Sequence, residues 1–102
     1  MNVLNVLDEA KLAPAGVAMQ NITVSNAAVG VAKANAAARA VFVTVDAQGV
    51  TVTFDGTVPV AGTNGHALGT TYIAIWSVER WNAARFIRTS GSDGYVRATE
   101  LA

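Results

Sequence analysis

Residues 39–56 read Arg-Ala-Val-Phe-Val-Thr-Val-Asp-Ala-Gln-Gly-Val-Thr-Val-Thr-Phe-Asp-Gly, and this stretch decides the fold class. Side chains alternate between the two faces of a strand, so apolar residues at every second position build one apolar face. Those faces consist of Val41, Val43 and Val45 on a first strand and of Val50, Val52 and Phe54 on a second. The reverse faces carry Phe42, Thr44, Thr51 and Thr53. We expect a hairpin around Asp46–Gly49 with the valines in the core and the threonines outside. Its register sets Val45 against Val50, Val43 against Val52 and Val41 against Phe54.

Similar short alternating segments recur along the rest of the chain, separated by turn residues. We expect strands near residues 21–25, 28–31, 71–76, 84–89 and 95–101, the last two forming a hairpin around Ser90–Gly94. Short strands with turns about every 8–12 residues are typical of antiparallel sandwiches and barrels. The sequence therefore predicts one all-β domain over residues 21–102, an antiparallel, jelly-roll-like β-sandwich of about six to eight short strands.

Residues 1–20 depart from this pattern. Val3, Leu4, Val6 and Leu7 have spacings compatible with one face of a short helix that ends before Pro14, and residues 13–18 form a small-residue link. On a monomer these apolar side chains would be an exposed patch. We interpret residues 1–20 as an N-terminal arm that contacts another subunit, although an arm packed on its own domain fits the sequence equally well.

Composition narrows the possible functions. The chain has 102 residues, a net charge of zero, 52% hydrophobic and only 14% charged residues, whereas about a quarter is usually charged. So little charge favours burial of part of the surface in a partner, and neutrality argues against nucleic-acid binding. We expect no membrane-spanning segment and no signal peptide. The absence of cysteine excludes disulfides and thiolate metal sites.

Catalytic signatures are missing. His66 is the single histidine, and a triad or a zinc site needs more partners than it can provide. Ser92 lies in a turn between two strands, which is not the setting of a nucleophile elbow. Asp46, Asp55 and Asp93 lie in glycine-containing turns, where aspartate commonly accepts bonds from backbone N–H groups. We therefore expect no enzyme activity, no cofactor and no metal.

Aromatic residues leave three interpretations open. Tyr72, Trp76, Trp81 and Tyr95 could pack in the core, contact a protein partner or form a sugar-stacking platform. Phe42 lies on the threonine face of its strand, where another layer or another subunit must cover it. The loop over residues 56–70 is long and rich in Gly and Thr, which is typical of functional loops.

One run of motifs resembles a known group of proteins. Val50–Phe54 is followed by Asp55-Gly56-Thr57-Val58-Pro59, then Gly65-His66-Ala67-Leu68, and later by Ala84–Thr89 and a Gly/Ser/Asp turn. Over residues 20–100 this resembles the small β-sandwich virion proteins of tailed bacteriophages, which include head decoration (cement), head-fibre and connector-associated proteins. The resemblance implies a protein that binds and has no catalytic residues.

The expected function is accordingly that of a virion structural protein assembled in the host cytoplasm, most simply a capsid decoration protein. Its expected partners are copies of itself, with a symmetric trimer favoured, and a major capsid or other virion protein. The expected interface residues are Val3, Leu4, Val6, Leu7, Phe42, Tyr72, Trp76 and Trp81. The alternative is a carbohydrate-binding or fibre-associated β-sandwich module that uses Tyr72, Trp76 or Trp81.

Overall fold

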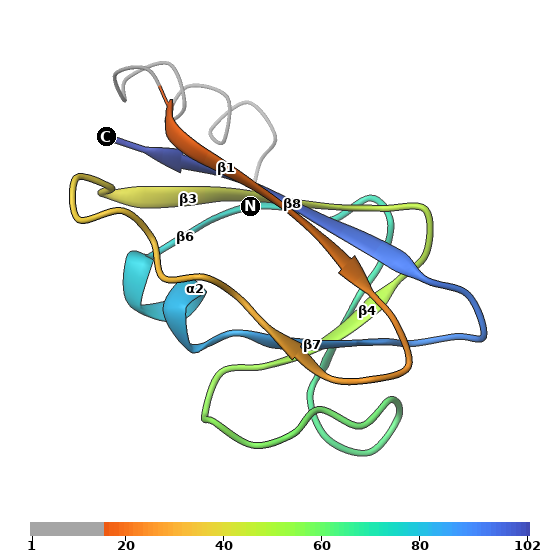
Figure 1. Cartoon of the computed structure of the whole chain (residues 1–102). Helices are drawn as coiled ribbons and strands as arrows, with labels where there is room; N and C mark the ends of the chain where they lie inside the picture. Colours follow the sequence, from red (N-terminus) through yellow and green to blue (C-terminus); the bar gives the residue numbers. More distant parts are fainter. Residues whose placement is uncertain (1–15) are drawn as a thin grey trace.

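The computed structural model describes residues 16–102, which form two antiparallel four-stranded sheets packed together (Figure 1). Sheet A has the order β1-β8-β3-β6, with β1 (Gly16–Val24), β8 (Gly94–Leu101), β3 (Ala40–Asp46) and β6 (Ile73–Trp76). Sheet B has the order β2-β7-β4-β5, with β2 (Val29–Gly30), β7 (Arg85–Arg88), β4 (Val50–Thr53) and β5 (His66–Leu68). A short helix, α2 (Val78–Ala83), connects β6 to β7. The all-β class predicted from the sequence is confirmed.

The stretch over residues 39–56 does not form a hairpin. Strand β3 pairs with β8 and β6, and strand β4 pairs with β7 and β5, so the loop 46–49 crosses from sheet A to sheet B. The expected pairing of Val45 with Val50 and its neighbours is therefore wrong. Period-two alternation determines which face of each strand is buried, but a crossing buries both apolar faces between the sheets just as well as a hairpin does.

The expected hairpin around Ser90–Gly94 is also a crossing, because β7 belongs to sheet B and β8 to sheet A. The two crossings lie beside each other, and the N–H of Thr89 donates to the carbonyl of Gly49 at 3.2 Å. A Cβ on Gly94 would come within 2.5 Å of the Gln48 carbonyl, so only glycine allows this approach. Figure 1 shows both crossings at the end of the domain opposite α2.

The core lies between the sheets and contains the valines that the sequence assigned to it. The five valines of β3 and β4 are at most 3% exposed: Val41, Val43, Val45, Val50 and Val52. Phe54 packs at the margin of this core and is half-buried. Thr51 and Thr53, on the opposite side of β4, are nevertheless only 1% and 4% exposed. They point away from the core, as expected, but the chain covers them from the other side, as described below.

Strand β1 begins at Gly16, earlier than the sequence pattern indicated. It pairs with β8 from Gly16 opposite Leu101 to Val24 opposite Gly94. Residues 16–20 thus belong to sheet A and not to an arm or a link. The physical reason is the backbone of β8, whose N–H and C=O groups on that side would otherwise form an open sheet edge.

The loop between β2 and β3, residues 31–39, is held by two side chains of sheet A. The amide of Gln20 exchanges two hydrogen bonds with the backbone of Ala32, at 3.0 and 3.2 Å. The carboxylate of Glu100, which is 3% exposed, accepts a hydrogen bond from the backbone N–H of Asn35. This buried carboxylate therefore has a structural role in fixing the loop.

Candidate functional site

The outer side of sheet A has no second layer among residues 16–102. Strand register places a terminal row on it, Gly16, Leu101 and Ala40, of which Leu101 is only 7% exposed, and three further rows. The first row crosses all four strands as Met19, Thr99, Phe42 and Ile75. The second contains Asn21, Arg97, Thr44 and Ile73, and the third Thr23, Tyr95 and Asp46. We call these three rows the A face.

The A face exposes large apolar side chains. Met19 is 65% exposed, and Ile73 and Tyr95 are each 38% exposed. Phe42 and Ile75 lie next to each other in the first row and are partly exposed. Phe42, Ile75 and Ile73 are neighbours on β3 and β6, whereas Thr99 separates Phe42 from Met19. Exposed apolar residues that gather in this way can mark an interaction surface.

The charged groups of the A face are Arg97 in its second row and Asp46 in its third row. The guanidinium of Arg97 lies 3.4 Å from the carboxylate of Asp46 and 5.6 Å from the ring centre of Tyr95. It also donates to the side chain of Asn21 at 3.4 Å. An exposed ion pair of this type contributes at most about 1 kcal/mol to stability. An apolar row with polar groups at its border has the composition of a protein interface.

The structure separates the residues that the sequence grouped as an interface. Phe42 lies in the first row of the A face. Trp76 and Trp81 do not reach the surface, since they are 2% and 0% exposed, and Tyr72 is half-buried beside them. The other expected contacts, Val3, Leu4, Val6 and Leu7, lie outside the described residues.

Trp76 and Trp81 belong to an aromatic cluster in the core. The indole N–H of Trp76 donates to the hydroxyl of Tyr72 at 2.8 Å, and that of Trp81 donates to the carbonyl of Ala32 at 3.3 Å. The Trp76 ring stacks on Phe86 with ring centres 6.3 Å apart. Helix α2 carries Trp81 inward. Because both indoles are buried and hydrogen-bonded, these residues form core packing and provide no platform for a sugar.

The outer side of sheet B, in contrast, is covered by the chain itself. The hydroxyl of Thr53 donates to the carbonyl of Thr57 at 2.7 Å, and the Thr51 hydroxyl lies 2.9 Å from that of Thr89. Gly65 approaches so closely that a Cβ there would lie 2.8 Å from the Thr51 methyl group. Its φ of +122° is also unfavourable for other residues. We call the loop over residues 54–65 the covering loop.

Hydrogen bonds within the covering loop give it a defined shape. The carboxylate of Asp55 accepts from the hydroxyl and the N–H of Thr57, at 2.6 and 3.1 Å. These two bonds, the hydroxyl bond first, lower the pKa of Asp55. The side-chain amide of Asn64 donates to the Val58 carbonyl at 2.9 Å, and the backbones of Val60 and Asn64 exchange two bonds of 2.9 Å. The long loop is thus a rigid cover.

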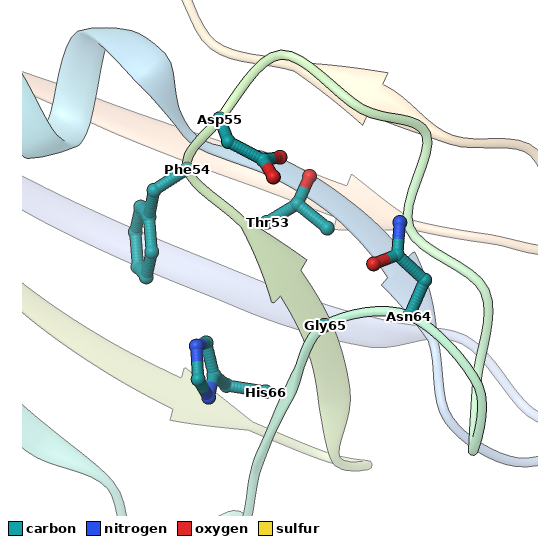
Figure 2. Close-up of a pocket in the computed structure, with 6 residues that line it drawn as sticks. All are labelled: Thr53, Phe54, Asp55, Asn64, Gly65 and His66. Atoms are coloured by element: carbon teal, nitrogen blue, oxygen red, sulfur yellow. The ribbon is translucent and has the colours of Figure 1, made fainter.

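A surface pocket of about 280 Å³ lies where the covering loop meets β4 and β5 (Figure 2). It is lined by Thr53, Phe54, Asp55, Asn64, Gly65 and His66. Figure 2 shows the rings of Phe54 and His66 on one side of Thr53, with Asn64 on the other. The ring centres of Phe54 and His66 are 6.3 Å apart, and the guanidinium of Arg80 lies 5.2 Å from the Phe54 ring centre.

The pocket offers little chemistry. Thr53, Asp55 and Asn64 use their polar groups to hold the covering loop. No hydroxyl there is activated by a neighbouring base, because the Thr53 hydroxyl donates to a backbone carbonyl. In residues 16–102 no group of three His, Asp or Glu side chains could hold a metal ion. We assign no reaction to this pocket.

Sequence reasoning missed most of the A face. Met19 was assigned to the arm, and Ile73, Ile75 and Thr99 were not recognised as neighbours of Phe42. The signal that could have found Met19 is the alternation of residues 18–24, in which Ile22 and Val24 face inward and Met19 outward.

Comparisons with protein-family models, with curated proteins and with solved structures give no match to this chain. In the part of the chain that the structure describes, no helix is long and apolar enough to cross a membrane.

Proposed function

We propose that the protein is a non-enzymatic structural protein of a bacteriophage virion, a capsid decoration protein that stabilises the head by protein–protein contacts. The observation that carries the proposal is the A face. Its first row is apolar on three of its four strands, and Met19 is 65% exposed. A partner that covers this row removes its apolar surface from water, and burial of one Phe or Met side chain is worth about 1.5–3 kcal/mol.

The order of the strands supports a jelly-roll sandwich as the finer description of the fold. The antiparallel pairs include β1·β8, β2·β7, β3·β6 and β4·β5. These are the pairs of one long hairpin whose two arms are wrapped into two sheets. Jelly rolls occur in viral capsid domains and also in lectins. The strand pairing therefore fits both classes of protein, and the distinction between them depends on the surface residues.

The surface favours the capsid class. The carbohydrate-binding alternative relied on Tyr72, Trp76 and Trp81, and the two tryptophans are buried. An assembly protein needs a rigid frame and a surface with few charges to desolvate, and the A face carries only Arg97 and Asp46, which pair with each other. The proposed partners are copies of the chain in a symmetric oligomer, with a trimer favoured, and the major capsid protein.

Purified particles of the phage that encodes the chain provide the test. Quantitative mass spectrometry should find the chain at a fixed ratio to the major capsid protein. Phe42→Asp, on the A face, should be lost from the particles. Ala67→Asp, an exposed position on β5, should remain bound. Absence of the unmodified chain from particles, or retention of Phe42→Asp at the normal ratio, would contradict the proposal.

A further inference from the structure

We propose that the A face binds residues 2–12 of a neighbouring copy of the chain, so that copies are linked by exchange of their N-terminal segments. This inference rests on the proposed function of a self-assembling structural protein and identifies the segment that covers the A face.

The segment has the right length and pattern for the first row of the A face. Residues 2–12 in helical form are about 16 Å long at 1.5 Å per residue. Four strands about 4.8 Å apart span about 14 Å across the sheet. Within the segment Val3, Val6, Leu7 and Ala10 have the i, i+3, i+4, i+7 spacing of one helix face. A helix with this apolar stripe matches the row from Met19 to Ile75 in length and in polarity.

The segment also joins the domain beside that row. Gly16 pairs with Leu101 at the first position of β1, and Met19 of the first row lies three residues further along the same strand. Strand β1 is at the edge of sheet A. The segment of each copy therefore starts at the edge of sheet A, beside the first row.

Chain direction favours a neighbouring copy over the same copy. Followed backwards from Gly16, the direction of β1 leads past the end of the sheet and away from Met19. To cover its own A face the chain has to reverse within residues 13–15, a stretch at most about 10 Å long. Reaching the A face of a neighbour requires no such reversal.

The absence of native cysteine allows a direct test by disulfide cross-linking. One tagged copy carries Leu7→Cys in the segment, and a second, differently tagged copy carries Thr99→Cys in the first row. The control partner carries Ala67→Cys, which lies on the outer side of sheet B opposite Thr51. After mixing and mild oxidation, the cross-linked heterodimer should form on the order of 10-fold more with Thr99→Cys than with Ala67→Cys, because docking raises the local thiol concentration.

A single chain with both Leu7→Cys and Thr99→Cys separates exchange from self-coverage. Exchange predicts cross-linked oligomers, whereas a cross-linked monomer would show that the segment covers its own face and would overturn the inference. Equal yields with Thr99→Cys and Ala67→Cys would overturn it as well. If the cross-link fails while Phe42→Asp is still lost from particles, the proposed function stands and another chain covers the A face.

Discussion

On the outer side of sheet B, Thr51 and Thr53 are 1% and 4% exposed although they are polar, whereas on the outer side of sheet A the apolar Met19 is 65% exposed. The difference follows from what the chain does after each strand. Strand β4 continues into the covering loop, which returns over the threonines through Thr57 and Gly65. Strand β3 continues into a crossing, and β6 continues into α2, so neither returns over the A face. Among residues 16–102, the chain covers the two threonines of sheet B but does not cover the A face.

The largest expected effect on stability comes from the contact between the covering loop and sheet B. Gly65→Ala places a Cβ 2.8 Å from the Thr51 methyl group and from the Val52 carbonyl, at a φ of +122°. We expect the free energy of unfolding to fall by about 2–4 kcal/mol. Met19→Ala, on the exposed A face, should change it by less than about 0.5 kcal/mol. Urea denaturation of both variants measures the difference, and similar losses for the two would refute the distinction between the faces.

A smaller effect on stability is expected when a threonine hydroxyl is removed from the outer side of sheet B or from the A face. Thr53→Val removes the 2.7 Å hydrogen bond to the Thr57 carbonyl and should cost about 1 kcal/mol. Thr44→Val is the matched change on the A face, where the side chain is partly exposed, and should stay within about 0.5 kcal/mol of the parent. Thermal unfolding of the pair is sufficient. Equal costs would mean that the covering loop does not depend on this hydroxyl.

The smallest expected effect is the loss of Asp55's contribution to fold stability at acidic pH. The hydrogen bonds from Thr57 lower the pKa of Asp55 in the folded chain below its ordinary value of 3.8. A carboxyl with a lowered folded pKa contributes stability above its unfolded pKa, and this contribution is lost as the pH falls through the folded pKa. Asp55→Asn should therefore unfold at a slightly lower temperature than the parent at pH 7. The gap should close in strongly acidic solution, well below pH 3.8. A gap that is independent of pH would assign the effect to packing and not to charge.

Sequence alone predicted the all-β class and the buried sides of β3 and β4, because alternation depends only on which residues are apolar. The predicted strand pairing was wrong. Residues 46–49 and 90–94 were expected to be hairpin turns, but the chain crosses between the two sheets at both places. Alternation does not distinguish a hairpin within one sheet from a crossing between two sheets, because both arrangements bury Val45 and Val50.

The surface was predicted less well than the core. Trp76 and Trp81 were assigned to an interface because these residue types are common in hot spots, but the same large rings also fill cores. The burial of Thr51 could not be predicted either. It depends on the path of the covering loop, which is set by Gly65, Asn64 and Asp55 contacts that no periodicity shows.

The central claim is that the A face binds another chain, and Phe42→Ala tests it most directly. Analytical ultracentrifugation of this variant and of the parent measures self-association, and denaturation measures fold stability in the same samples. We predict association about 10- to 100-fold weaker, with the free energy of unfolding of the monomer lowered by less than about 1 kcal/mol. Unchanged association together with a large loss of fold stability would place Phe42 in the core of its own domain and contradict the account.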